Sequence, residues 1–250
     1  MCLVLFGLDA HPTLPLVVLA NRDEFYARPT DASGWWADAP GLLAGRDLKS
    51  GGTWMGVTRS GRWTAVTNVR DPATEREDAR SRGDLTRRFL SSDTPPGVYA
   101  ETASRQIDDY NGFNLLVGDL DATWYVSTRE RTPRRLGPGV YGLSNDTLDS
   151  PWPKVQRGTR GLANLLEQQP FPHEAAFRLL AHAEPAPDAA LPDTGVGLAW
   201  ERTLSSVYIE TADYGTRTRT LLTRSNDGGV DWTERRRDGG ETAVQFRVSA

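Results

Sequence analysis

Segments with strand-like and helix-like patterns occur in separate blocks along this chain, and their order limits the folds that it can adopt. The first block holds two short apolar runs at 2–8 and 15–21 and two further runs at 51–58 and 61–69. Each pair has the spacing of a β-hairpin. The first two runs are apolar on both faces, which indicates a sheet that is covered on each side.

The later blocks change period several times. Helical spacing is found at 80–90, 98–110, 154–168 and 173–183. Strand patterns are found at 113–119, 123–128, 140–145, 205–211, 216–224, 230–237 and 242–249. Segregated blocks favour an α+β fold over alternating βαβ units. We therefore expect one domain over residues 1–250, a four-layer αββα sandwich of two antiparallel sheets with a helix pair on each outer face.

Composition argues against several classes of partner and cofactor. A net charge of −4 leaves no basic surplus for a nucleic acid backbone, and the apolar runs are too short for insertion into a membrane. The start of the chain lacks the basic region of a signal peptide, so we expect a cytoplasmic protein. A single cysteine allows no internal disulfide, and no spacing indicates zinc, calcium or a phosphate loop, so we expect no metal and no cofactor. The sequence leaves the oligomeric state open.

The single cysteine stands at position 2, directly after the initiator Met1. Removal of Met1 would give Cys2 a free α-amino group close to its own sulfur. Such an amine titrates at about 7.7–8, so it can act as the base for the thiol at neutral pH. The alternative is that Cys2 is a small buried residue, which is the commonest fate of a free cysteine. The residues alone leave both interpretations open.

Charged residues follow the second apolar run in the sequence ANRDEF at 20–25. In a hairpin they lie beside the neighbouring strand. There Arg22 could hold a carboxylate or donate to a sulfur, and Asp23 could accept a hydrogen bond from a terminal ammonium. A charged loop with internal Arg–Asp pairing is the alternative.

Two asparagines stand where predicted strands end. Asn68 closes the run AVTN, and Asn145 closes the run VYGLSN. Asparagine is a poor strand former, and its amide could donate a hydrogen bond to a developing oxyanion. Each asparagine could equally initiate a turn.

Taken together, these motifs resemble the NRDE family, also called the transport and Golgi organisation protein 2 family. The resemblance covers the chain almost end to end, with the motifs in order. They are MCLVLF at the start, NRDEF at 21–25, GGTWMGV at 51–57, NVR at 68–70, SRG at 81–83, NGFNLL at 111–116, LSNDTLDSPWPKV at 143–155, LPDTG at 191–195, SSVYIE from 205 and YGTRTRTLL ending at 222.

That family is similar in turn to the N-terminal nucleophile hydrolases of the penicillin V acylase and bile salt hydrolase branch. The resemblance implies an αββα sandwich whose mature N-terminal cysteine attacks a linear amide. The implied site residues are Cys2, Arg22, Asp23, Asn68, Asn145 and Arg217. The arginine and aspartate after the second strand would orient the nucleophile, and the asparagines would stabilise the oxyanion and position the substrate. The first hypothesis is therefore an amidohydrolase that acts on a small molecule through a Cys2 acyl-enzyme.

A second hypothesis is a non-catalytic carrier or trafficking protein. Members of the family have been linked to secretory organisation, haem handling and lipid or acyl-CoA metabolism, so the implied ligand is a hydrophobic anion such as haem or an acyl-CoA. The tryptophans at 35, 36, 54 and 63 could line its pocket, with arginines to meet its charge. No recognisable haem motif surrounds Cys2, Met55 or a histidine. A third hypothesis is a protein-interaction module.

Overall fold

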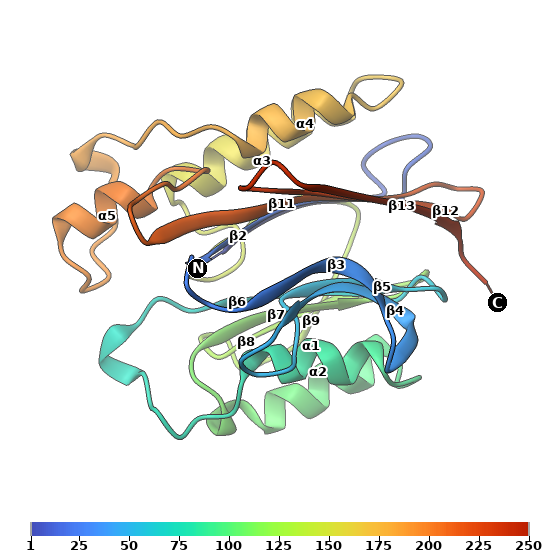
Figure 1. Ribbon diagram of the computed structural model, residues 1–250, viewed down its shortest axis with the longest axis horizontal. Helices are drawn as coiled ribbons and strands as arrows, with labels where there is room; N and C mark the ends of the chain where they lie inside the picture. Colours follow the sequence, from blue (N-terminus) through green and yellow to red (C-terminus); the bar gives the residue numbers. More distant parts are fainter. Residues whose placement is uncertain (1, 250) are drawn as a thin grey trace.

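The computed structural model describes residues 2–249 and shows four layers (Figure 1). Two antiparallel sheets stack face to face. Helices α3 (Pro153–Leu166) and α4 (His173–Leu180) cover the outer face of one sheet, and α1 (Arg82–Leu90) and α2 (Pro96–Arg105) cover the outer face of the other. This arrangement confirms the α+β sandwich that the segregated blocks predict.

The first sheet has six strands in the order β10-β1-β2-β11-β12-β13, and every neighbouring pair is antiparallel. The strands of this sheet are β1 (Cys2–Leu8), β2 (Leu16–Phe25), β10 (Gly139–Leu143), β11 (Tyr214–Arg224), β12 (Gly229–Arg236) and β13 (Glu241–Arg247). The hairpin expected at the start of the chain is therefore at the centre of a sheet, where it is covered on both faces.

The second sheet has seven strands in chain order. They are β3 (Thr30–Trp36), β4 (Ala39–Asp47), β5 (Met55–Thr58), β6 (Trp63–Asn68), β7 (Phe113–Gly118), β8 (Thr123–Ser127) and β9 (Arg134–Leu136). Three single turns of 3-10 helix lie in the connections, at η1 (Pro72–Thr74), η2 (Ile107–Asp109) and η3 (Asp188–Ala190).

Strand β1 supplies two separate cores because successive side chains of a strand point to opposite faces. Val4 and Phe6 pack between the two sheets, in the same cluster as Trp63 of β6. Leu3 and Leu5 pack outward against α3 and α4. The apolar character of this run on both faces thus reflects its central place in the sandwich.

The segment 205–211, expected as a strand, is a connection instead. A fifth helix, α5 (Leu198–Leu204), precedes it, and the pairing nearby is a single bridge between Glu210 and Gly215. Strand β11, which follows this segment, has no free edge for it to join, because β11 pairs with β2 on one side and with β12 on the other. Val207 and Ile209 are nevertheless buried. Their apolar pattern therefore reflects packing against the core and not pairing in a sheet.

Candidate active site

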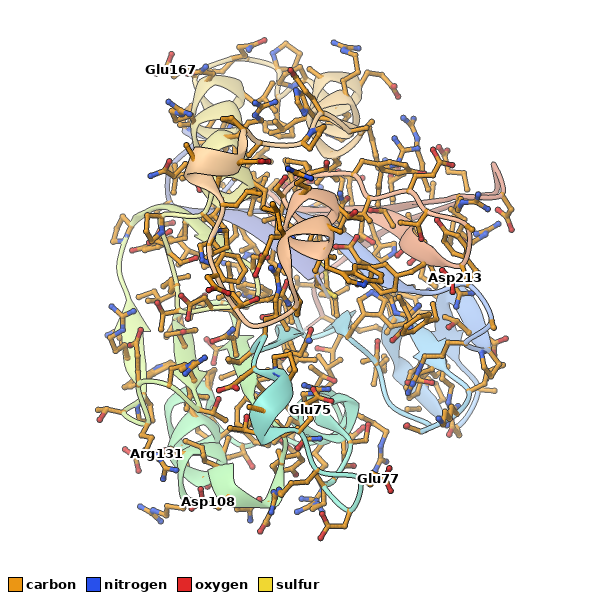
Figure 2. All side chains as sticks on the ribbon, turned by 90° about the vertical axis from the view of Figure 1, so that its left-hand side faces the viewer. Glu75, Glu77, Asp108, Arg131, Glu167 and Asp213 are labelled. Carbon is orange, nitrogen blue, oxygen red and sulfur yellow. The ribbon has the colours of Figure 1, made fainter. Side chains whose placement is uncertain are left out.

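A cleft of about 1040 Å³ opens at the end of the sandwich where the chain begins. The start of β1, the end of β2, the end of β6, the 195–204 segment and the segment between β6 and α1 all contribute to its walls. Figure 2 shows this end of the molecule, with Glu75 and Glu77 on the segment between β6 and α1. Cys2 lines the cleft, as do Arg22, Asp23 and Asn68.

The β1–β2 hairpin places the first cysteine and the NRDE sequence side by side. Cys2 is directly opposite Arg22 in the register. By strand alternation Cys2 is on the same face as Val4 and Phe6, the face toward the second sheet, whereas Asp23 is on the opposite face of β2. The backbone carbonyl oxygen of Cys2 accepts a hydrogen bond of 3.0 Å from Ser144 Oγ. The nucleophile candidate is therefore fixed by its own backbone.

The thiol of Cys2 is in an environment that favours its protonated form. Burial raises the pKa of this thiol above its ordinary value, and the negative charge of Asp23 raises it further, while Arg22 acts in the opposite direction. A thiol with a raised pKa is a weak nucleophile until a base removes its proton. Chemistry at Cys2 therefore requires a base near the sulfur.

Arg22 is 5% exposed, and its guanidinium is stacked on the ring of Trp54, with Cζ 4.2 Å from the ring centroid. Burial lowers its pKa, and the proximity of Cys2 raises it. The stacking holds the charge over the face of an aromatic ring, where a cation is stabilised by the ring quadrupole. Arg22 thus supplies a fixed positive charge next to the sulfur.

Asp23 is 2% exposed and accepts a hydrogen bond of 2.7 Å through Oδ1 from Thr216 Oγ1 of β11. Burial raises the pKa of this carboxyl, and the positive charge of Lys154 opposes the rise. Thr216 Oγ1 accepts a hydrogen bond of 2.9 Å from the backbone N–H of Ile209. Asp23 is therefore held in place by the neighbouring strand and balanced by a buried amine.

Lys154, near the start of α3, does not line the cleft, but its charge acts on Asp23 from behind, and no motif in the sequence marks this role. It is 2% exposed, and among residues 2–249 its Nζ has no hydrogen-bond partner. Burial lowers its pKa to about 8, and the charge of Asp23 acts against that fall. Helical spacing was an available signal, because Lys154 is four residues before Gly158 and eight before Leu162 on the buried face of α3.

The asparagine at position 21 also has a role that the motif alone does not reveal. Its Nδ2 donates hydrogen bonds of 2.9 Å to Leu180 O, at the end of α4, and of 2.7 Å to Val207 O. Asn21 thus ties β2 to the helix layer. Within NRDE, the asparagine is structural, while the arginine and aspartate reach the cleft.

The two predicted asparagines are in contact, but only one of them lines the cleft. Asn145 is 1% exposed, and its Nδ2 donates to the backbone oxygen of Asn68 at 2.9 Å and to its Oδ1 at 3.1 Å. Its Oδ1 accepts a hydrogen bond from Ser144 Oγ at 3.1 Å. Because Asn145 uses the oxygen of Asn68, the Nδ2 of Asn68 is turned away from it. Asn68 is therefore the candidate oxyanion donor, and Asn145 positions it.

Arg217 is displaced from the other predicted residues. It lies at a bulge in the pairing of β11 with β2, between Thr216 and Thr218, and its Nη1 donates to the backbone oxygens of Phe25 and Arg28. It lines a second cavity next to the cleft instead of the cleft itself. Arg22 lines both cavities.

The described part of the chain offers no cluster of three or more histidine, cysteine, aspartate or glutamate side chains that could hold a metal ion. Within residues 2–249, no helix has the length and apolar character needed to cross a membrane. Met1, whose removal the nucleophile hypothesis requires, lies outside the described residues.

The fold and the cleft define an αββα sandwich protein in which a cysteine begins an interior strand and lines the cleft. Comparison with known sequences identifies the family. The family model described as Transport and Golgi organisation 2 matches residues 1–239. The chain therefore belongs to the Transport and Golgi organisation 2 family, as its motifs predict.

Curated relatives span the same length. The Transport and Golgi organization protein 2 homolog of Bos taurus is 36% identical over 277 aligned positions, which cover 100% of both chains. The Homo sapiens homolog is 34% identical, and the alignment covers 94% of this chain and 92% of the relative. The Drosophila melanogaster protein is 26% identical, with 94% and 91% covered.

Two solved structures have weaker similarity. The Caenorhabditis elegans ortholog of N-acylethanolamine-hydrolyzing acid amidase has a TM-score of 0.48 at 8% identity and covers 88% of this chain and 92% of its own. The C2A mutant of conjugated bile acid hydrolase from Clostridium perfringens has a TM-score of 0.46 at 10% identity, with 98% and 92% covered. Similarity at this level assigns no activity to the chain.

Proposed function

We propose that this protein is an N-terminal cysteine amidohydrolase that cleaves a linear amide of a small molecule. The observation that carries the proposal is the register of the β1–β2 hairpin, which puts Cys2 opposite Arg22, with Asp23 the next residue of β2, and all three residues line the cleft. A nucleophile, a fixed cation and a buried carboxylate are the groups that acyl transfer by a cysteine needs.

The first step is activation of the thiol. Removal of Met1 would leave the α-amino group on Cys2, within reach of the sulfur of the same residue. Because burial raises the pKa of the thiol, its proton must pass to a base, and this amine has an ordinary pKa of about 7.7–8. Asp23 would accept a hydrogen bond from the ammonium that results, and Arg22 would stabilise the thiolate.

The thiolate then attacks the amide carbonyl carbon and forms a C–S bond. The negative charge that develops on the carbonyl oxygen is stabilised by Asn68 Nδ2, which the contact with Asn145 turns away from that residue. When the C–N bond breaks, the leaving amine takes the proton from the ammonium of Cys2. A water molecule then gives a proton to the α-amino group of Cys2, and its oxygen attacks the thioester carbonyl. The C–S bond breaks, the carboxylic acid is released, and the Cys2 thiolate takes the proton back from the ammonium.

The cleft walls limit the substrate to a molecule with apolar parts. Phe25, Trp54, Trp200 and Tyr214 line the cleft, and the rings of Phe25 and Trp200 are packed edge-on against Tyr214 at 5.1 and 5.7 Å between centroids. Phe25 is 52% exposed and Trp200 41% exposed, which leaves their apolar surface open to a ligand. These side chains would contact the acyl part of an amide.

The proposal can be tested with the wild-type protein and the Cys2→Ala and Cys2→Ser variants. A panel of N-acyl amines is incubated with each protein, and the released primary amine is measured with fluorescamine. We expect release by the wild type only, together with a thioester adduct on Cys2 in the intact mass. Release by Cys2→Ala at the wild-type rate would overturn it.

The second candidate function is a carrier of a hydrophobic anion, and one observation favours it. Basic side chains of Lys49, Arg76 and Arg82 line the same cleft as the aromatic wall, so the cleft offers both apolar and cationic contacts to a ligand such as haem or an acyl-CoA. A carrier would retain its ligand in Cys2→Ala, whereas an amidohydrolase would lose its turnover. Binding and turnover measured on the same variant therefore separate the two functions.

A further inference from the structure

A second cavity of about 210 Å³ lies next to the cleft, between the end of the first sheet and strand β3 of the second. Four arginines line it, and we call it the arginine pocket. They are Arg22 of β2, Arg217 of β11, and Arg236 and Arg237 at the end of β12. Tyr26 and Thr218 also line it. The proposed amide chemistry at Cys2 uses Arg22 but none of the other five residues.

Three donor atoms at the arginine pocket are buried without a partner. Among residues 2–249, Arg22 Nη1, Tyr26 Oη and Thr218 Oγ1 make no hydrogen bond although solvent does not reach them. Arg22 is 5% exposed and Thr218 is 7% exposed. Buried polar groups in proteins are nearly always hydrogen-bonded, so unpartnered donors on three residues that line one cavity are consistent with an acceptor that binds there.

The pocket is built from fixed elements. Thr218 is directly opposite Arg22 in the pairing of β11 with β2, just after the bulge that turns Arg217. The N–H of Arg237 donates a hydrogen bond of 2.9 Å to Arg217 O, and Cζ of Arg237 is 4.3 Å from the centroid of the Tyr26 ring. The donors are therefore held in position before any ligand binds.

Acidic side chains offset only part of this charge. Asp31 and Asp238 line the pocket, and Asp238 Oδ1 is 3.6 Å from Arg236 Nε. The buried carboxyl of Glu234 feels the charges of Arg236 and Arg22, and burial raises its pKa. Arg237 Nη2 is 3.5 Å from Glu210 Oε1 on the exposed side. Four arginines against two lining aspartates leave an excess of positive charge for an anion.

We propose that the arginine pocket binds a phosphate-type oxyanion, either inorganic phosphate or the phosphoryl group of a small molecule. Guanidinium groups match the geometry of phosphate oxygens, and the phenol and hydroxyl add two further donors to the same centre. A volume of about 210 Å³ suits a group of this size and is smaller than the pockets that hold drug-sized ligands.

The test is titration of the full-length protein with inorganic phosphate and, separately, with phenyl phosphate, by isothermal calorimetry at constant ionic strength set with potassium chloride. Two conservative variants, Thr218→Val and Tyr26→Phe, each remove one unsatisfied hydroxyl. Tyr99→Phe is the matched control, because its hydroxyl donates to Leu85 O at 2.6 Å outside the pocket. Urea unfolding without phosphate checks that the two pocket variants are folded, since neither loses an internal hydrogen bond.

We expect saturable phosphate binding that weakens about tenfold in Thr218→Val and in Tyr26→Phe and is unchanged in Tyr99→Phe. Tighter binding of phenyl phosphate than of inorganic phosphate would identify a phosphoryl group of a larger molecule as the ligand, and the reverse would identify the free ion. Absence of saturable binding of either probe, or equal binding by wild type and both pocket variants, would overturn the proposal. The measurement does not involve turnover at Cys2, so its outcome is independent of the amidohydrolase proposal.

Discussion

Asn145 donates two hydrogen bonds from one nitrogen to Asn68, to its backbone oxygen at 2.9 Å and to its side-chain oxygen at 3.1 Å. The two residues are 77 positions apart in the sequence. Asn68 is the last residue of β6 in the second sheet, and Asn145 comes two residues after the end of β10 in the first sheet. This contact joins the sheets at the cleft. It also fixes the direction in which the Asn68 amide donates.

Replacement of Asn145 is expected to affect mainly the stability of the protein, and replacement of Asn68 mainly the rate of acylation. Asn145→Ala removes a buried donor to two oxygens, so the free energy of unfolding falls by about 1–3 kcal/mol in urea titrations. Asn68→Ala, at a half-buried site, affects stability less but slows acylation of Cys2 by about 10²–10³-fold if it is the oxyanion donor. The double variant should show a coupling energy of at least about 0.5 kcal/mol. Strict additivity of the two effects would contradict the positioning role of Asn145.

Glu201 of α5 forms a buried ion pair close to the wall of the cleft. Its Oε2 is 2.7 Å from Arg70 Nη1, and its Oε1 accepts hydrogen bonds from the N–H and hydroxyl of Thr194, next to the cleft residue Gly195. Glu201→Ala removes the carboxylate that pairs with a buried arginine, so we expect a loss of about 3–5 kcal/mol in the free energy of unfolding.

The matched control is Asp188→Ala, which breaks the exposed pair between Asp188 and Arg202 of the same helix. We expect little measurable change in stability there, because exposed pairs are screened by water and salt. Hydrogen exchange of the Gly195 amide should accelerate in Glu201→Ala and stay unchanged in the control. Equal exchange in both variants would mean that Glu201 does not hold the cleft wall.

The buried amine of Lys154 predicts a specific pH dependence. Its pKa is lowered to about 8 in the folded state from 10.5, so between these values the unfolded chain binds more protons than the folded one. The contribution of Lys154 to the free energy of unfolding is therefore complete above pH 10.5. It decreases as the pH falls from 10.5 to about 8, by a total on the order of 3 kcal/mol. Unfolding free energies measured from pH 8 to 10.5 should rise in the wild type relative to Lys154→Met.

Lys49, the other lysine of the chain, is exposed and supplies the control. Lys49→Met should keep the wild-type dependence on pH. Parallel curves for the wild type and Lys154→Met would show that the folded state does not disfavour the charged form of Lys154.

The strand and helix periods predict the layers of this fold because the number of buried faces of an element determines its pattern of apolar residues. The pattern of the run at 2–8 predicts cover on both faces, and the run is an interior strand of its sheet with buried side chains on each face. The strand Thr30–Trp36 has no regular apolar pattern, because it is partly exposed and its pairing with β4 shifts register twice. The segment 205–211 has the apolar pattern of a strand but no free sheet edge to join.

The sequence names candidate site residues but does not give their arrangement. Hairpin spacing was sufficient to put Cys2 beside Arg22 and Asp23. It could not show that Asn145 lies behind Asn68, because that contact depends on how the two sheets stack. Nor could it show that Arg217 turns into the arginine pocket at a bulge, or that Lys154 on α3 reaches the charge of Asp23 across the layers. These relationships are set by packing between distant segments.

The central claim is that Cys2 is an N-terminal nucleophile, and an intact mass measurement with a thiol-directed acyl probe tests it most directly. The protein is isolated from cells, its mass is recorded before and after reaction with the probe, and Cys2→Ser is treated in parallel. The account predicts a chain that lacks Met1 and gains one acyl group on Cys2, with no addition to Cys2→Ser. A chain that retains Met1, or a Cys2 that stays unlabelled in the folded protein and reacts only after denaturation, would contradict it.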